Sequence, residues 1–402
     1  MRSTKIGRRP PRHHIRHRTN LPAPPAQRGE EERHSLHTIV TRICTLPPRL
    51  AAYLITRFSS PGDTVLDPFC GKGTVALEAC RLARVGLGSD LSPEAVCAAR
   101  AAVRAPSIRR VEDYIAALAR ETQSLEATAE IRDQLHSLTP DIAQFYHPAT
   151  LRSLLAWRLL LRRDRSDCGR FVQALLLGIL HGKGSHFLSL RCSHSYSMSP
   201  NYVRRYVAEH GLTAPQRTVA QCLLARARRV LRDAAPAVRG HARVADARRL
   251  PYGPTSVELI LTSPPYFSVH RYARDNWLRL WFLGYSDYRT IQRRLLQTSD
   301  VNRYRAQMRL AFTEMKRLLV PGGRALVFVG DVTLRRRHGR KTVKTAHLLA
   351  KDAAGVGLTC DGIVQDTIPR KYKVAGYMAL KGGISTERLL ILRKPSRRQE
   401  TR

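Results

Sequence analysis

The chain has 402 residues, 43% of them hydrophobic, which is enough for a sizeable core in one large domain or two ordinary ones. No apolar run approaches the roughly 20 residues that a bilayer-spanning helix needs, and no apolar signal segment follows the basic N-terminus, so a cytoplasmic protein without a membrane helix is expected. The chain has 69 lysines and arginines against 31 acidic residues, which gives a net charge of +38. This charge indicates a polyanionic partner, most simply nucleic acid. A coding bias toward arginine is the alternative, although such a bias does not explain the shortage of acidic residues.

The first stretch of the chain predicts an arm rather than a folded element. Residues 1–33 are basic and rich in proline, a composition that does not suit a packed core, and both phosphate contact and a merely solvated tail are open. A helix with proline in its first turn is then expected at "PPRLAAYLITRFS". The stretches "GDTVLDPFCGKGTVALEACRLA" and "RVGLGSDLSPEAVCAARAAV" each predict a strand, a turn and a helix, the second helix with Ser92 as its N-cap and Pro93 at its first position.

A long helical segment interrupts this alternation. It is rich in arginine and contains a polar stretch expected to be irregular, "HGKGSHFLSLRCSHSYSMSPNYVRRY". Strands and helices then alternate again, which predicts a parallel, doubly wound sheet, and a basic cluster, Arg335–Lys344, is expected in the loop after the strand "RALVFVGD". The expected divisions are a basic disordered arm at 1–33, the first part of the sheet domain at 34–105, a helical insertion at 106–240, the second part of the sheet domain at 241–395 and a tail at 396–402.

The spacing of cysteine and histidine predicts no metal site. None of the eight cysteines forms a C-x-x-C pair, so a zinc ribbon is not expected. The cysteines are expected to be reduced thiols, most of them buried. The histidines of "HGKGSH" lack the acidic partner of a metalloprotease helix.

Two acidic strand ends and a glycine turn predict a cofactor site. Asp67 ends the first strand, and Gly71 and Gly73 in the following turn would let a ligand approach the backbone at a helix N-terminus. Asp90 ends the second strand, where a carboxylate can bind both hydroxyls of a ribose; a loop acid that caps the following helix is the alternative. Together these residues indicate a nucleoside cofactor, and on them alone a dinucleotide stays open.

A second motif stands where the apolar strand "ELILT" ends in "SPPY". Pro264 and Pro265 cannot continue the hydrogen bonding of a sheet, so this segment is expected to be a stiff loop with bare carbonyls. Stiff loops at strand ends are where α/β enzymes place their chemistry.

The motifs "DPFCGKGT" and "TSPPY" together resemble the DNA amino-methyltransferases that use S-adenosylmethionine, the N4-cytosine and N6-adenine group. The likeness covers about residues 34–100 and 240–395; "SDLSPEAV" is similar to the family's ribose-binding step, and "VADARRL" to its turn near the cofactor adenine. The sequence departs from the family at Ile39-Val40, where Tyr-Pro is usual, and at Lys72, where Ser is frequent. Lys72 is expected to be a solvated side chain, and a contact with the methionine carboxylate is the alternative.

The resemblance implies a class I methyltransferase (Rossmann-like) fold, a mainly parallel sheet flanked by helices, with the helical insertion added. It implies S-adenosyl-L-methionine as cofactor and double-stranded DNA with a flipped target base as substrate, with a cognate restriction endonuclease as a further partner. The residues that match the family's cofactor-binding motifs are Asp67, Phe69, Gly71, Gly73, Thr74, Asp90 and Asp246. The residues that match its catalytic tetrapeptide are Ser263, Pro264, Pro265 and Tyr266.

This tetrapeptide suits methylation of an exocyclic amino group, whose lone pair is delocalised into the base. Ser263 Oγ and the Pro264 carbonyl are acceptors that can draw the nitrogen toward sp3 geometry, the prolines hold them rigidly, and Tyr266 offers a face for the flipped base. The serine form is commonest among the N4-cytosine enzymes of the family, so cytosine N4 is the predicted target. Methylation at cytosine C5 is not expected, because it needs a cysteine nucleophile that its own family places in a Pro-Cys dipeptide, which this sequence lacks.

Substrate contacts are expected from two regions. Asp275 and Asn276 follow the catalytic loop and are placed to face the substrate, whereas Trp277 and Trp281, one helical turn apart, are expected in the core. In the insertion, the candidates for base or phosphate contacts are Arg191, Tyr196, Asn201, Arg204 and Arg205. Three alternatives to N4-cytosine methylation of DNA stay open: N6-adenine methylation of DNA, amino methylation of RNA, and nucleic-acid binding without catalysis.

Overall fold

The structure, a computed structural model, describes residues 33–42, 45–182, 184–191, 199–266, 272–296, 298–336, 339–365 and 384–396. Nearly all of the expected arm, the tail after residue 396, Cys44, Cys192 and Tyr196 lie outside these residues. The cysteines within them are free thiols, as their spacing predicts: Cys70, Cys80, Cys97, Cys168, Cys222 and Cys360. Within the same ranges no helix is long and apolar enough to cross a membrane.

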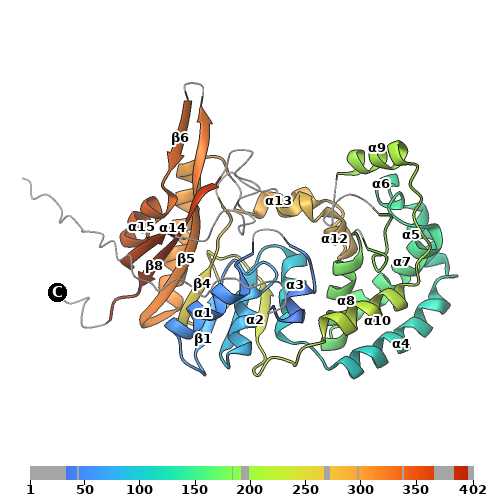
Figure 1. Cartoon of the computed structure of the whole chain (residues 1–402), viewed down its shortest axis with the longest axis horizontal. Helices are drawn as coiled ribbons and strands as arrows, with labels where there is room; N and C mark the ends of the chain where they lie inside the picture. The colour runs from blue at the N-terminus through green and yellow to red at the C-terminus, as the bar shows by residue number, and fades with distance from the viewer. Residues whose placement is uncertain are drawn as a thin grey trace, which may run out of the picture.

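One sheet organises the chain, with its strands in the order β3-β2-β1-β4-β5-β8-β7 and with β6 paired to β5 (Figure 1). The strands β1 to β5 run parallel to one another, whereas β8 is antiparallel to both β5 and β7, and β6 is antiparallel to β5. This is the class I methyltransferase fold that the resemblance implies. The strands are β1 Thr64–Asp67, β2 Val85–Asp90, β3 His241–Val244, β4 Val257–Thr262, β5 Leu319–Arg336, β6 Gly339–Val343, β7 Thr359–Gln365 and β8 Ile384–Arg393.

Helices cover both faces of this sheet. Successive strand residues point to opposite faces, so Leu66 and Val327 pack with α14 and α15, whereas Val65 and Leu326 pack with α1 and α2. Because both faces of the sheet are buried, its buried strands appear in the sequence as continuous apolar runs without alternating polar residues. The helices of this part are α1 Pro48–Phe58, α2 Thr74–Arg81, α3 Pro93–Val103, α14 Val301–Leu318 and α15 Thr345–Gly355, with a 3-10 turn η2 at Ser35–Thr38.

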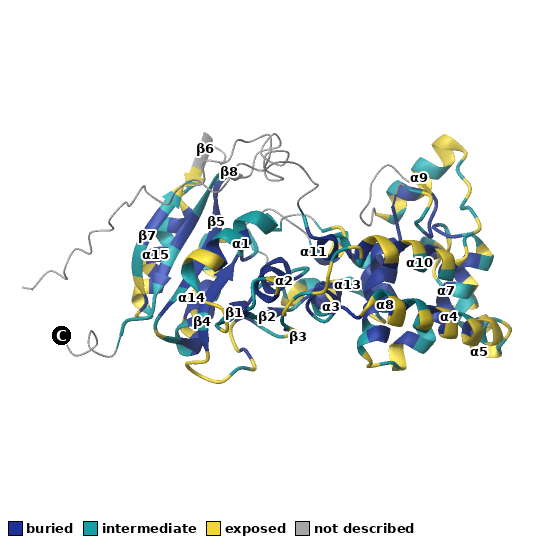
Figure 2. Cartoon of the chain, turned by 60° about the horizontal axis from the view of Figure 1, so that its bottom comes forward, coloured by how far each residue is buried: buried dark blue, intermediate teal, exposed yellow. Residues whose placement is uncertain are grey.

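Between α3 and β3 the chain forms a group of helices, as predicted for the insertion (Figure 1). Their apolar core, which contains Trp157, continues into Ala98 of α3, and Arg104 after α3 bonds to Asp167 of α8 at 3.0 Å. Figure 2 shows these helices buried toward their common centre and exposed outward. They therefore pack directly on the sheet's flanking helix. They are α4 Ile108–Leu125, α5 Ala129–His136, α6 Pro140–Ala143, α7 Pro148–Arg163, α8 Asp167–Ile179, α9 Pro200–His210 and α10 Val219–Val230.

The segment between β4 and α14 connects the sheet to this group of helices. It contains α11 Tyr272–Asp275, α12 Trp277–Phe282 and α13 Tyr288–Arg294. Trp281 is buried, and Trp277 packs edge-on against Phe145 of the insertion with ring centroids 5.8 Å apart. Trp281 therefore lies in the core, as expected, whereas Trp277 is half-buried and packs against that core.

Helix α9 corrects the expectation that the polar stretch before residue 207 is irregular throughout. The last part of that stretch is helical from Pro200, because Ser199 caps the helix by accepting from Tyr202 N–H and Pro200 takes the first position. The pair Ser199-Pro200 in the sequence is the local pattern that predicts the start of this helix.

The basic cluster after "VFVGD" is likewise not a loop. Strand β5 runs on to Arg336 and pairs with β6 in an antiparallel hairpin that extends from the carboxyl end of the sheet (Figure 1). The β-branched pairs Val332 with Val343 and Thr333 with Thr342 lie across this ladder, and such residues favour extended backbone. The arginines between them concealed this pattern in the sequence.

Candidate cofactor and catalytic site

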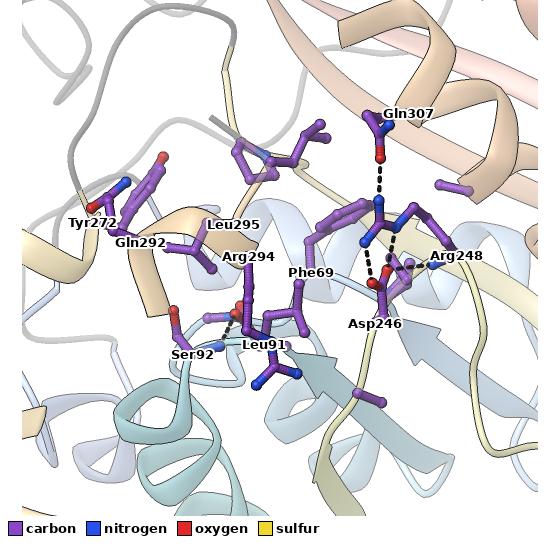
Figure 3. A pocket seen from close by; sticks show the side chains of 18 of the residues that line it. Phe69, Leu91, Ser92, Asp246, Arg248, Tyr272, Gln292, Arg294, Leu295 and Gln307 are labelled. Carbon is purple, nitrogen blue, oxygen red and sulfur yellow. Dashed lines mark hydrogen bonds and ion pairs between the residues drawn. The ribbon is translucent and has the colours of Figure 1, made fainter. Parts of the chain in front are cut away.

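The turns after β1, β2, β3 and β4 meet at the carboxyl edge of the sheet. The strand order passes from β1 outward to β2 and β3 and then returns to β4 on the other side of β1, which is the place where such sheets bind ligands. A cavity of about 430 Å³ lies there (Figure 3), a size typical of small-molecule sites. Predicted site residues that line it are Phe69, Gly71, Asp90, Asp246, Ser263 and Pro265.

The turn after β1 depends on a glycine in the left-handed region. Gly73 has φ 84° and directly precedes α2. A Cβ on it would lie 2.7 Å from Ala99 Cβ, so only glycine lets this turn approach α3 so closely. The next residue, Thr74, is buried, and its hydroxyl has no hydrogen-bond partner within the described parts of the chain.

Asp90 holds the two turns together. One carboxylate oxygen accepts from Gly71 N–H and the other from Ser92 N–H, both at 2.9 Å. Ser92 precedes α3, with Pro93 in its first turn as predicted, although the Ser92 side chain makes no cap hydrogen bond. An ionised carboxylate has about four lone-pair sites, so Asp90 keeps acceptor capacity on the side of the cavity.

Asp67 lies beneath the site rather than in the cavity wall. It is 5% exposed, and its Oδ1 accepts from both Phe69 N–H and Thr262 Oγ1. Burial raises the pKa of the Asp67 carboxyl to about 7, while the hydrogen bond from Thr262 opposes this rise. Asp67 thus links the turn after β1 to the end of β4.

Arg42 is a cavity residue that sequence reasoning missed. It donates to Glu94 of α3 at 2.7 Å and stands over the ring of Tyr272 at 5.7 Å from its centroid. Burial opposes its charge, but Glu94 and Asp90 outweigh that effect and raise the pKa of the guanidinium. Arg42 lies in the early segment where Ile39-Val40 departs from the family pattern, so the resemblance did not single it out.

Lys72 corrects the expectation of a solvated side chain. Its amine donates to the backbone oxygen of His37 at 3.0 Å, which attaches η2 to the cofactor turn. Burial, together with the charges of Arg33 and Arg42, lowers the pKa of Lys72 to about 8. The imidazole of His37 also bonds to Glu78 at 2.5 Å, which links η2 to α2, the helix that follows the turn.

The catalytic loop begins directly where β4 ends. Ser263 and Pro265 line the cavity, whereas Pro264 is buried and Tyr266 lies outside the lining. Ser263 Oγ donates to the Tyr266 hydroxyl at 3.4 Å, and that hydroxyl donates to Glu387 Oε1 at 3.2 Å. Glu387 comes from β8, and no motif pointed to it.

The predicted Asp246 and several arginines also line the cavity, with Asp246 and Arg248 beside Phe69 (Figure 3). Asp246 pairs with Arg248, whose guanidinium also donates to Gln307. Although partial burial opposes ionisation, the hydrogen bonds from Arg248 lower the pKa of Asp246. The other arginines in the lining are Arg293 and Arg294 of α13 and Arg303 of α14.

The residues expected to contact substrate lie away from this cavity. Asn276 is buried, donates to Tyr272 O at 2.9 Å and accepts from Arg279 at 2.6 Å; neither it nor Asp275 is in the lining. The candidates of the insertion are exposed: Arg191, Asn201, Arg204 and Arg205. The last three lie on α9, which Figure 1 shows on the far side of α12 from the sheet.

Comparison with protein families gives one match. Residues 16–101, which extend through the cofactor turn to near the end of α3, match the family model of the N6 and N4 methyltransferases, described as DNA methylase. No curated protein matches the chain.

Several solved structures are similar to parts of the chain. A protein assigned as a DNA modification methylase from Thermus thermophilus, in complex with S-adenosyl-L-methionine, is 23% identical over 38% of this chain and 52% of its own, with a TM-score of 0.25, so the match spans about half of its length. An S-adenosylmethionine-dependent methyltransferase from Methanosarcina mazei is 11% identical over 88% of this chain and 100% of its own (TM-score 0.35), and TrmN from Thermus thermophilus is 15% identical over 89% and 52% (TM-score 0.31). Through the segment that carries its cofactor turn, the chain therefore resembles the DNA methylase family to which its two motifs point.

Proposed function

We propose that this chain is an S-adenosylmethionine-dependent DNA methyltransferase that modifies the exocyclic N4 amino group of cytosine. The observation that carries this proposal is that both motifs reach one cavity: Gly71 and Asp90 of the cofactor turns line the same space as Ser263 of the catalytic loop. The family match over residues 16–101 supports the class of amino-methylating DNA methylases without separating cytosine N4 from adenine N6.

The cavity residues suit the chemistry of this cofactor. Asp90 would bind the ribose hydroxyls with its remaining lone pairs, and Phe69 and Asp246 are the proposed wall for the adenine. Arg42 and the N-terminus of α2 offer positive charge to the methionine carboxylate. The cofactor, when bound, supplies an electrophilic methyl group on its sulfonium.

The catalytic loop would act on the attacking amino nitrogen. Ser263 Oγ and the carbonyl of Pro264 accept the two N–H bonds of the target amine. These hydrogen bonds strengthen as the nitrogen pyramidalises, so they stabilise the transition state more than the bound substrate. Tyr266 would offer its ring to the flipped base. The serine at the first position favours cytosine N4, and adenine N6 is the second candidate because the same acceptors suit its amino group.

The proposed substrate is double-stranded DNA. A net charge of +38 favours a polyanion. The helical insertion at 106–240 is the proposed recognition region, with Asn201, Arg204 and Arg205 exposed on α9. A cognate restriction endonuclease stays a prediction from the resemblance.

Labelled methyl transfer tests this proposal. The purified chain is incubated with tritiated S-adenosylmethionine and either duplex DNA or structured RNA, with Ser263→Ala as the matched control. Label is expected in DNA, strongly reduced by the substitution. Label in RNA alone would support the RNA alternative, and DNA binding without any transfer would support a binding protein.

A further inference from the structure

Three polar groups connect the catalytic loop to the antiparallel strand β8. Ser263 Oγ donates to the Tyr266 hydroxyl at 3.4 Å, and this hydroxyl donates to Glu387 Oε1 at 3.2 Å. Both distances are long, as is frequent for catalytic hydrogen bonds before substrate binds. The contact joins residues 121 positions apart, so the fold rather than the local sequence brings it about.

The register of β8 places Glu387 in a position to reach the loop. Glu387 stands opposite Gly330 of β5, so no side chain from the paired residue lies beside it. The next residue, Arg388, is engaged by Asp331 at 2.9 Å. Successive strand residues point to opposite faces, which separates that ion pair from the Glu387 carboxylate.

The chemistry of these groups fixes the direction of the hydrogen bonds. An ionised carboxylate only accepts, so Tyr266 must give its proton to Glu387 and can then accept from Ser263. A serine hydroxyl has one proton and two lone pairs. Once its proton is committed to Tyr266, Ser263 Oγ presents only lone pairs to any other group, and these are what an amino N–H needs.

We propose that Glu387 is a positioning residue for methyl transfer, which acts through Tyr266 to keep Ser263 an acceptor toward the target amine. This inference rests on the proposed function, and Glu387 itself touches neither substrate nor cofactor. Tyr266 thus has two roles, a ring for the base and a hydroxyl for the relay.

The decisive variant is Glu387→Gln, which keeps the shape but lets an amide donate to Tyr266 and so reverses the relay. It is expected to lower kcat about tenfold, the effect of one lost hydrogen bond in the transition state. KM for DNA and the affinity for S-adenosylmethionine are expected to stay within about twofold. Tyr266→Phe, which keeps the ring, should lower kcat similarly, and the double variant should be no slower than either single one.

Two further variants separate positioning from general damage. Glu387→Asp keeps the charge and is expected to recover part of the lost kcat. Asp361→Asn makes the same carboxylate-to-amide change on β7, beside Arg393, and is expected to keep wild-type kcat. Wild-type kcat in Glu387→Gln, or a loss explained by weaker cofactor binding, overturns the relay.

The relay can also be judged without catalysis. If the wild-type chain transfers no methyl group to nucleic acid, the proposed function fails, and a double-mutant cycle on unfolding in urea decides about the relay. Each single variant, Tyr266→Phe or Glu387→Gln, changes the unfolding equilibrium constant by some factor. If the two residues interact, the factor measured for the double variant is expected to be about fivefold smaller than the product of the two single factors. Independent effects overturn the inference.

Discussion

Thr262 Oγ1 donates a 2.6 Å hydrogen bond to Asp67 Oδ1 and so joins the ends of the two strands that carry the catalytic and cofactor loops. The same oxygen also accepts from Phe69 N–H at 3.0 Å. Strands β1 and β4 are parallel neighbours, so this bond lies directly below the cavity. One buried carboxyl thereby fixes both loops relative to each other.

The first prediction concerns the pH dependence of stability through Asp67. Burial raises its pKa from 3.8 to about 7 in the folded chain, so between about pH 4 and 7 the folded state binds more protons, and the free energy of unfolding falls as pH rises. Asp67→Asn keeps the Oδ1 acceptor but does not ionise. The free energy of unfolding of the variant, measured relative to that of wild type, should therefore rise by about 3 kcal/mol between pH 5 and pH 8. Urea unfolding of both proteins at the two pH values measures this difference; a constant difference would refute the raised pKa.

The second prediction concerns Gly73. Gly73→Ala combines a left-handed φ with a Cβ 2.7 Å from Ala99 Cβ, and it is expected to cost about 3 kcal/mol of stability and to weaken cofactor binding. Gly62→Ala is the matched control, since Gly62 has φ 90° with no atom within 4 Å of the added Cβ, and it should cost only about 1 kcal/mol. If urea unfolding shows that both variants lose the same free energy of unfolding, the close approach of Gly73 to α3 does not contribute to stability.

The third prediction concerns Asp90. Asp90→Ala removes the acceptor for the ribose hydroxyls and the bonds to Gly71 and Ser92, so calorimetry should show S-adenosylmethionine binding weakened by about 1.5–3 kcal/mol. Asp63→Asn, at the opposite end of β1, should leave the affinity unchanged. Wild-type affinity in a folded Asp90→Ala variant would remove Asp90 from the cofactor site.

The fourth prediction concerns the salt dependence of DNA binding. If about six or more phosphates are contacted, the binding constant should fall about a thousandfold between 50 and 200 mM salt. Replacing Arg204 and Arg205 of α9 by alanine should reduce the slope of log K against log salt by about 2. Both arginines are exposed, and in the described part of the chain Arg204 pairs with Asp141 at 3.8 Å and bonds to Asn201, while Arg205 pairs with Glu209 at 3.5 Å; such exposed contacts stabilise little, so little stability should be lost. The control replaces Arg109 and Arg120 of α4, on the opposite side of the insertion in Figure 1, and should leave the slope unchanged; an equal loss from both pairs would remove α9 from the interface.

Much of the fold was readable from the sequence because its signals are local. Apolar runs ending in Asp67 and Asp90, and Pro93 after Ser92, place strands and helices where the structure has them. The residues that sequence reasoning missed depend on contacts between distant segments. Arg42 meets Glu94 across 52 positions and Glu387 meets Tyr266 across 121, and neither Arg42 nor Glu387 lies in a recognisable local pattern.

Lys72 shows the same limit from the other side. A lysine in a glycine turn is usually solvated, since burial disfavours its charge. Here η2 covers the turn and offers the His37 carbonyl, which only the tertiary structure reveals.

The measurement that tests the proposed reaction most directly is mass spectrometry of nucleosides from duplex DNA treated with the wild-type chain and S-adenosylmethionine. The Ser-Pro-Pro-Tyr loop predicts N4-methylcytosine as the product. N6-methyladenine alone would contradict the choice of base while leaving amino methylation standing. 5-Methylcytosine, or unmodified DNA from a folded, cofactor-binding protein, would contradict the proposed chemistry itself.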